Sequence, residues 1–336
     1  GDRPILSYIF LYTVLFIVYI FGVAWILKPR ENFTPIWPIL FFGLLFRIAI
    51  LPANQIQEDD VYRYLWDGKV FAHGVNPYKY PPGIVNDYKR LIIREPEAFL
   101  DRFSLEERNE LDLLYNLKWE NDRSVTFIER INHPDVPTIY PPLAQFVFRI
   151  VCQIAPDSIM AMRLGFLVFD LIAFGFIVLT LKSLGKNPSL CLIYFWSPLI
   201  VKETFNSTHL DIIGISLLCG SIYFLIRRLW TWALAFLALG VAGKFYPAIL
   251  FPLYIREMIY YCFDGRPSFR GLIKIVYSVM IFLGVIIICY LPFQGAGERI
   301  FTGLKTFTTF WQNNDSLFAI MVFIFKTFFS LEQGFT

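Results

Sequence analysis

The sequence contains few charged residues and very few histidines for its length. Charged residues make up 17% of the 336 residues, and only 3 residues are histidine, whereas about 25% of a typical soluble domain is charged. The formal net charge of +3 gives no indication of nucleic-acid binding. The shortage of charge therefore argues against a soluble protein and against a nucleic-acid partner.

Cysteine is also scarce, and it is not arranged in pairs. The cysteines lie far apart, without any Cys-x-x-Cys spacing, at Cys152, Cys191, Cys219, Cys262 and Cys289. Most of them lie in apolar runs, where cysteine packs as a small apolar side chain. This pattern predicts neither a disulfide framework nor a cysteine metal site.

Apolar residues dominate the chain. Hydrophobic residues make up 56% of it, and the mean hydropathy is +0.54. We therefore expect an all-α polytopic membrane protein with about 8–10 transmembrane or re-entrant helices. The apolar blocks lie near residues 5–27, 36–53, 140–155, 158–181, 189–202, 210–226, 230–255, 272–292 and 316–331.

The lengths of these blocks predict irregular helices. A helix needs about 20 apolar residues to cross a bilayer. Block 5–27 has that length and lacks a cleavage signature, so we expect a retained transmembrane helix. Blocks 140–155 and 189–202 are shorter, and proline at positions such as Pro198 and Pro247 interrupts helices. Broken or re-entrant helices around a cavity are expected here.

The polar and apolar stretches predict three parts. These are transmembrane helices in 1–53, an extracytoplasmic catalytic loop with interfacial helices in 54–139, and a transmembrane bundle in 140–336 with an outer loop at 293–315. Within the first loop, Ser104 and Glu107 have the spacing of a capping box, and the apolar residues that follow predict an amphipathic helix. We expect that helix to lie on the membrane surface or over the active site.

Basic residues predict the orientation in the membrane. Cytoplasmic connections are rich in Lys and Arg, and such residues cluster near 28–30, 182–186, 227–228 and 256–274. The loop 54–139 is then outside. For this orientation, we expect block 140–155 to be a re-entrant or half-crossing helix, and block 230–255 to break near Gly243 and Lys244, where the chain reaches the outer side and returns.

Three consecutive acids, Glu58, Asp59 and Asp60, follow an apolar block. An acid costs about 2.5–3.5 kcal/mol at the bilayer centre, so these three belong at the membrane–water boundary. They are either the solvated start of a loop or charges that meet a substrate there.

A second polar group lies between two apolar blocks, on the side of the membrane predicted for Asp60. It consists of Lys202, Glu203, Asn206, His209 and Asp211. We expect these residues and Asp60 to share one pocket, with capping and hydrogen bonding inside the bundle as the alternative. A metal site built from His209, Asp211 and the acids Glu58 to Asp60 is a further alternative. His209 and Asp211 are about 200° apart on a helix, so such a site would need an extended or capping geometry, and we assign no metal.

Further polar residues lie within or between apolar runs. Lys244 must snorkel, pair with an acid or bind an anion such as a lipid phosphate. Arg163 and Asp170 are seven residues apart, so we expect them to form a structural pair on one helix face. The segment Trp311 to Asp315 is a candidate outer-loop contact.

Several short motifs resemble the membrane glycosyltransferases of the GT-C class. They are Asp60-Val-Tyr, Trp66-Asp67-Gly68, Gly74-Val75-Asn76-Pro77-Tyr78, Thr138-Ile139-Tyr140-Pro141-Pro142-Leu143-Ala144, Trp196-Ser197-Pro198-Leu199 followed by Glu203, His209 and Asp211, and Lys244-Phe245-Tyr246-Pro247. The chain is most similar to bacterial polyprenyl-phosphate-mannose-dependent mannosyltransferases of the GT87 type and to the catalytic subunit of eukaryotic GPI mannosyltransferase I. The likeness is sparse and extends from about residue 58 to 250.

The chain departs from that pattern in two ways. Its acidic motif is Glu58-x-Asp60 where the GPI enzyme has Asp-x-Asp, which favours Asp60 over Glu58 as the functional acid. The chain also has few helices for the class, as expected of a compact member or of one that lacks C-terminal spans.

The resemblance implies an inverting transfer of a hexose, with mannose as first choice, from a polyprenyl-phosphate carrier to a glycolipid or glycan acceptor. It implies a multi-pass protein of the bacterial inner membrane whose active site faces the periplasm, and it needs no cofactor besides the lipid donor; a divalent metal is not expected. Partner subunits are left open.

The resemblance also implies roles for individual residues. Asp60 would be the general base, with a pKa raised by Glu58 and Asp59. Lys244 would bind the donor phosphate, with Lys202 and Arg63 as second choices. The sugar or acceptor would meet His209, Asp211, Glu203, Trp66, Tyr78 and Tyr140, together with Tyr64, although the aromatic residues also suit core or membrane-belt packing.

Two other classes also have buried charges and broken helices. One is a transporter or lipid flippase, which would usually show paired repeats that this sequence lacks. The other is a catalytically inactive scaffold with the same fold, which binds a lipid or a partner subunit.

Overall fold

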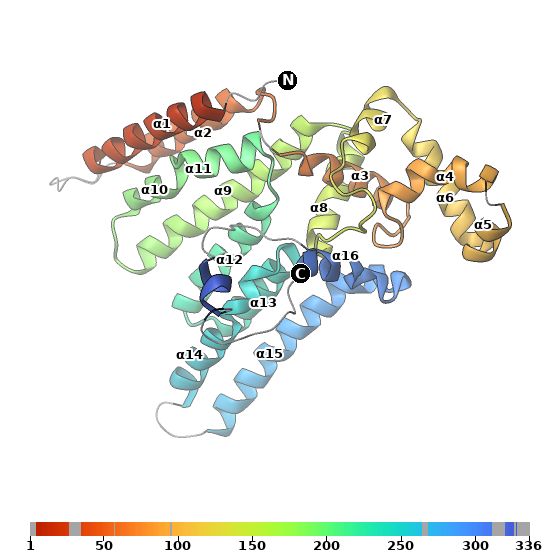
Figure 1. The fold of residues 1–336 in the computed structure, drawn as a ribbon. Helices are drawn as coiled ribbons and strands as arrows, with labels where there is room; N and C mark the ends of the chain where they lie inside the picture. Colours follow the sequence, from red (N-terminus) through yellow and green to blue (C-terminus); the bar gives the residue numbers. More distant parts are fainter. Residues whose placement is uncertain are drawn as a thin grey trace.

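The described part of the chain is built from helices. The computed structural model describes residues 5–26, 35–56, 58–94, 96–263, 268–310, 320–325 and 327. These residues form α-helices with short 3-10 and π segments and no strand (Figure 1). The expected all-α class is therefore confirmed. The Trp311 to Asp315 segment and basic residues 28–30 lie outside the described residues.

Within the described residues, three helices are long and apolar enough to cross a membrane. They are α1 (Ile5–Ile26), α9 (Ile159–Ser183), and α15 (Phe269–Tyr290) with its 3-10 extension η4 (Leu291–Ala296). Shorter apolar helices accompany them: α2 (Ile36–Ile50), α8 (Pro142–Ile154), α12 (Asp211–Ile226) and α13 (Trp230–Gly243). No residue of α1 is buried. Such exposed apolar surface needs lipid or another apolar surface around it, which supports a membrane protein.

The first two helices pack on a broken segment of the chain. That segment consists of η1 (Pro188–Cys191), α10 (Leu192–Phe195), α11 (Pro198–Val201) and the π-helix η2 (Lys202–Asn206). Pro198 begins α11, because proline can start a helix but cannot continue one. The interruption expected in block 189–202 is thus present.

A buried ion pair joins α2 to α9, and it corrects one expectation. Asp170 does not pair with Arg163 but with Arg47, whose Nε lies 2.5 Å from Oδ2 of Asp170. Arg163 instead donates to the carbonyl oxygens of Leu51 and Asn206. These carbonyls lie near the start of α9, where Arg163 is located, whereas Asp170 is two turns further along the helix.

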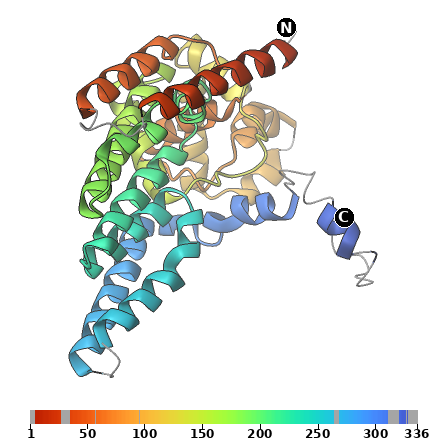
Figure 2. The same ribbon diagram turned by 90° about the vertical axis from the view of Figure 1, so that its left-hand side faces the viewer.

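The remaining long helices form a bundle. In it α9 packs on α12, α12 on α13, and α13 on α15. The chain breaks after Gly243 as expected, because Lys244 is extended, and η3 (Tyr246–Leu250) and α14 (Phe251–Phe263) follow. Helices α14 and α15 extend together away from the rest of the molecule in both overall views (Figures 1 and 2).

The predicted first loop folds into a helical lobe. It contains α3 (Asp60–Ala72), α4 (Pro82–Arg94), α5 (Pro96–Arg102), α6 (Leu105–Lys118) and α7 (Asp122–Glu129). The Ser104–Glu107 capping box is confirmed, and it begins the amphipathic helix α6. Leu111 and Leu114 of α6 are buried, but Leu105 is exposed and does not belong to the buried face.

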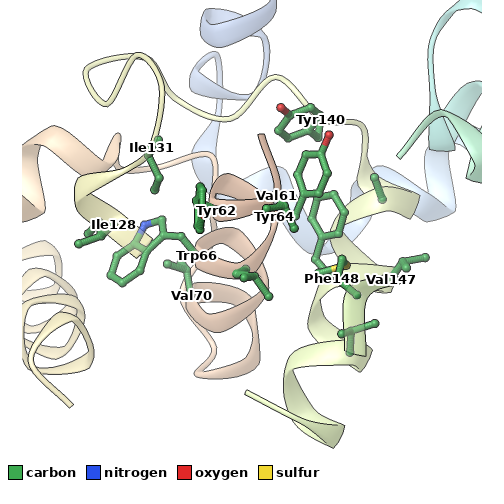
Figure 3. Packing of buried hydrophobic residues seen from close by; sticks show 14 of the residues in the cluster. Val61, Tyr62, Tyr64, Trp66, Val70, Ile128, Ile131, Tyr140, Val147 and Phe148 are labelled. Atoms are coloured by element: carbon green, nitrogen blue, oxygen red, sulfur yellow. The ribbon is translucent and has the colours of Figure 1, made fainter. Parts of the chain in front are cut away.

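Helix α3 has two buried faces. Trp66 packs towards Ile128 on one side, whereas Tyr64 stacks on Phe148 of α8 on the other (Figure 3). The approach of α3 to α8 requires glycine at position 68, since a Cβ there would lie 2.5 Å from the Phe148 carbonyl oxygen. This tight contact sets the rotation of α3, and with it the side chains that face the site.

Candidate active site

A cavity of about 440 Å³ lies where the helical lobe meets the bundle. We call it the central cavity. It is lined by Glu58, Asp60, Arg63, Tyr64, Asn132, His133, Val136, Pro137, Ile139, Tyr140, His209, Asp211, Lys244 and Phe307. Its size falls in the usual range of about 300–1,000 Å³ for small-molecule sites. The structure thus brings Asp60 together with His209, Asp211 and Lys244, which are distant in the sequence.

The first turn of α3 separates two adjacent acids. Asp60 is the first residue of the helix and lines the central cavity, as does Glu58. Asp59 does not line it, because its Oδ1 accepts a hydrogen bond of 2.8 Å from Nη2 of Arg130. Consecutive helical residues point about 100° apart, so the helix start directs neighbouring carboxylates to different surroundings.

Arg63 lies one turn after Asp60, and two hydrogen bonds fix its guanidinium group. Its Nε donates to Oδ1 of Asp67 at 2.8 Å, and its Nη1 donates to the Val136 carbonyl oxygen at 3.0 Å. Nη2 is buried and has no hydrogen-bond partner among the described residues. The guanidinium is therefore fixed at the cavity wall with unused hydrogen-bonding capacity, which suits an anionic ligand.

His209 lies in the turn between η2 and α12, against Glu203. Its Nδ1 lies 2.8 Å from Oε2 of Glu203, and the other carboxylate oxygen of Glu203 is 2.8 Å from Nζ of Lys202. Burial opposes protonation of His209, but the contact with Glu203 and the charges of Glu203, Asp60 and Glu58 together raise its pKa. Glu203 and Lys202 do not line the cavity; Glu203 contacts His209 from behind.

Lys244 reaches the cavity from the break after α13. Its Nζ lies 3.2 Å from Oδ2 of Asp211, the first residue of α12. Both side chains are substantially exposed, 34% for Lys244 and 43% for Asp211. Exposed pairs of this kind contribute little net energy, so an incoming anion can compete for the ammonium group.

Two tyrosines form part of the cavity wall. The rings of Tyr64 and Tyr140 meet edge to face with centroids 4.9 Å apart. Burial raises the pKa of both phenols, so both remain neutral hydrogen-bonding groups at ordinary pH. They are the members of the predicted aromatic set that line the cavity.

Trp66 and Tyr78 lie outside the cavity lining. Trp66 is buried in the core beside α7 (Figure 3). The Tyr78 hydroxyl donates to the Tyr140 carbonyl oxygen at 2.6 Å, and its ring packs on Phe293. Tyr78 therefore positions Tyr140 from behind.

The Gly74 motif has a structural explanation at the end of α3. Gly74 has φ of +83°, which favours glycine. The amide of Val75 donates to the Val70 carbonyl oxygen, and that of Gly74 to the Phe71 carbonyl oxygen. These two bonds form a Schellman motif, which ends α3 and directs the chain towards Tyr78.

Sequence reasoning missed one wall of the cavity. The missed lining residues are Asn132, His133, Val136 and Phe307. The signal that could have indicated this wall is His133, one of only 3 histidines in the chain, directly before Pro134 and seven residues before Tyr140.

The described part of the chain contains no group of three or more His, Cys, Asp or Glu side chains placed to hold a metal ion. Among the lining residues, Lys244 pairs with Asp211, and Arg63 pairs with Asp67.

Comparison with known proteins indicates a sugar-transfer activity. No curated protein and no solved structure matches the chain. Residues 133–259, less than half of the chain, match the MptA_B family model, described as alpha-(1->6)-mannopyranosyltransferase, N-terminal domain. The matched segment includes Tyr140, His209 and Lys244 of the cavity but not Asp60. This similarity supports a glycosyltransferase that transfers a mannosyl group.

Proposed function

We propose that the central cavity transfers a mannosyl group from a polyprenyl-phosphate carrier to a hydroxyl group of a glycolipid or glycan on the extracytoplasmic side of the membrane. The observation that carries this proposal is that a carboxylate, Asp60, and two cations, Arg63 and Lys244, line one cavity. The similarity of residues 133–259 to mannosyltransferases supports the sugar. The apolar helices beside the cavity suit a lipid-linked donor.

Asp60 is the general base of the proposed reaction. The acceptor oxygen attacks the anomeric carbon of mannose while its proton moves to the Asp60 carboxylate. The bond between that carbon and the phosphate oxygen breaks, and its electron pair leaves with the lipid phosphate. Attack from the face opposite the leaving oxygen inverts the anomeric centre. The acceptor oxygen must approach Asp60 within about 2.6–3.2 Å.

Lys244 and Arg63 stabilise the lipid phosphate as it leaves. Negative charge builds on the phosphate as the bond breaks, and fixed cations directed at developing charge lower the barrier. Lys244 can exchange its weak pairing with Asp211 for the phosphate. Arg63 adds a second fixed positive charge at the cavity wall.

The remaining polar groups orient the sugar. His209 uses Nδ1 for Glu203, which leaves Nε2 for a sugar hydroxyl. Asp211 can accept hydrogen bonds from sugar hydroxyls when Lys244 turns to the phosphate. Tyr140, with its neutral phenol, completes the wall that the sugar meets.

The decisive experiment compares the two adjacent acids. The full chain is incubated with polyprenyl-phosphate-mannose and a membrane lipid extract, and mannosyl transfer to lipid or glycan is measured. Asp60→Asn should reduce the rate by about 10²–10⁴-fold, the usual contribution of a general base. Asp59→Asn should retain transfer, because Asp59 contacts Arg130 outside the cavity. Equal transfer by wild type and Asp60→Asn would show that Asp60 is not the base.

Two other outcomes would replace the proposal. If the wild type binds the donor lipid but transfers mannose to no acceptor, the chain is an inactive scaffold. If lipid or sugar moves across proteoliposome membranes at the same rate with Asp60→Asn as with the wild type, the chain is a transporter.

A further inference from the structure

A second cavity, of about 400 Å³, lies on the other side of α3. Tyr62 lines it, whereas Tyr64 lines the central cavity, and these two side chains leave α3 on different faces (Figure 3). We call it the arginine cavity. It is lined by Leu51, Pro52, Ala53, Asn54, Gln55, Tyr62, Arg130, Ile159, Met160 and Arg163. None of these residues belongs to the central cavity.

The arginine cavity contains a buried positive charge without a countercharge. Arg163 is 4% exposed and pairs with no carboxylate among the described residues. Its donors reach neutral acceptors, chiefly carbonyl oxygens such as those of Leu51 and Ala53. Buried charges are usually paired, so an uncompensated guanidinium at a cavity wall favours an anionic ligand.

The other groups around this cavity are also donors. Arg130 is half exposed, and its guanidinium lies over the Tyr62 ring. Nε2 of Gln55 is buried without a hydrogen-bond partner in the described part of the chain. Ile159 and Met160 belong to the first turn of the 25-residue helix α9, whose free backbone N–H groups carry partial positive charge. The positive potential of the arginine cavity thus comes from Arg163 and from the start of α9, because the charge of Arg130 is paired with Asp59.

The position of the cavity indicates the source of the anion. It lies where the apolar helix α2 ends and the apolar helix α9 begins, which is the level of the membrane–water boundary. An apolar groove of about 460 Å³ between α1, α2 and α11 reaches the same residue, Ala53. Polar groups at the boundary and an apolar groove beside them match a phosphate headgroup and a hydrocarbon chain.

We propose that the arginine cavity binds the phosphate group of a membrane lipid, with a hydrocarbon chain of that lipid in the groove between α1, α2 and α11. This site is separate from the central cavity and does not depend on the proposed mannosyl transfer. A bound lipid would neutralise Arg163 and fix the end of α2 against the start of α9. It would also reach Arg130, which holds Asp59 beside the first turn of α3.

The test measures binding to the purified full chain in a neutral detergent. The probes are a short-chain phosphatidic acid, the diacylglycerol with the same chains, and inorganic phosphate, and binding is read by native mass spectrometry and by thermal stabilisation. We expect phosphatidic acid to bind and diacylglycerol not to bind. Arg163→Gln should weaken binding at least roughly tenfold, because it removes a charged hydrogen-bond donor.

Matched variants keep the test decisive. Arg163 also holds carbonyl groups, so Arg130→Gln, at a half-exposed position, provides a second measurement with a smaller expected loss. Arg256→Gln is the control, because Arg256 is 78% exposed and lies in α14, away from the cavity. Gly22→Leu should weaken the binding of phosphatidic acid but not of inorganic phosphate, because Gly22 lines the groove for the hydrocarbon chain. The fold should tolerate this change, since a Cβ added at Gly22 meets no atom within 4 Å.

Three results would overturn the proposal. One is unchanged phosphatidic acid binding in both arginine variants, and another is binding of diacylglycerol as tightly as phosphatidic acid. The third is binding of inorganic phosphate as tightly as phosphatidic acid, with no effect of Gly22→Leu, which would make free phosphate the ligand and exclude the lipid.

Discussion

Nδ1 of His209 lies 2.8 Å from Oε2 of Glu203, so the imidazole at the cavity wall is held by a carboxylate behind it. The contact fixes which ring nitrogen remains for a ligand. It also favours the protonated ring, and a protonated ring beside Asp60 and Glu58 reduces the negative charge of the cavity. The pair of His209 and Glu203, called the dyad below, thus makes the charge of the cavity depend on pH.

The dyad predicts a specific pH dependence of stability. The pKa of His209 is raised above 6.5. Its contribution to the free energy of unfolding is therefore complete below pH 6.5 and is lost as the pH rises through the raised pKa. The pKa of Glu203 is lowered from 4.5 to about 2 by its contacts with His209 and Lys202, against the effect of burial, so its contribution is complete above pH 4.5 and is lost as the pH falls towards 2.

Glu203→Gln tests this window. The variant should be less stable than the wild type by about 1 kcal/mol between pH 4.5 and 6.5, and the difference should shrink above the raised pKa of His209. Thermal unfolding of both proteins at pH 5.5 and pH 9 measures it. A difference that grows at pH 9 would show that the protonated imidazole is not what Glu203 stabilises.

Lys244 should contribute to use of the donor lipid more than to use of the acceptor. Lys244→Ala removes a mobile cation that can follow the donor phosphate, so we expect a KM for the donor lipid raised by roughly tenfold or more, with little change in the KM for the acceptor. Initial rates at varied donor and acceptor concentrations separate the two constants. A larger change in the acceptor KM would assign Lys244 to acceptor binding.

Tyr78 should affect transfer through Tyr140. Tyr78→Phe removes the hydrogen bond to the Tyr140 carbonyl oxygen and should cost about 1–3 kcal/mol, because a buried acceptor loses its partner. It should also lower kcat by displacing Tyr140. The control is Tyr80→Phe, which removes a 2.6 Å hydrogen bond to Glu110 away from the cavity; it should lower stability without lowering kcat. Equal effects on kcat would show that Tyr78 acts only on stability.

The sequence predicted part of the convergence of the separated polar residues. Asp60, His209 and Asp211 line one cavity as expected, together with Lys244, whereas Lys202, Glu203 and Asn206 of the same predicted pocket do not line it. The break at Lys244 followed from the chemistry of glycine and proline in the same way. These inferences rest on local amino-acid composition, which can be read from one sequence.

The rotation of helices could not be predicted. The rotation of α3 depends on the contact between Gly68 and the Phe148 carbonyl oxygen, 80 residues along the chain. This rotation decides whether Asp60 or Asp59 faces the cavity, and whether Trp66 faces a ligand or the core. Partner choice in the core is equally non-local. Arg163 was matched to Asp170 by helical spacing, but Arg47, separated from Asp170 by 123 residues, occupies that position.

The pair of Arg47 and Asp170 leads to a prediction about the core of the membrane bundle. Both side chains are fully buried, and the Tyr194 hydroxyl also donates to Asp170. Arg47→Met should destabilise the protein by about 3–5 kcal/mol, because it leaves a buried carboxylate without its cation. The double variant Arg47→Met with Asp170→Leu removes that unpaired charge and should recover most of the loss. Thermal unfolding of the full chain in detergent compares the three proteins. If the double variant is as unstable as Arg47→Met alone, shape and not charge compensation determines the role of this pair.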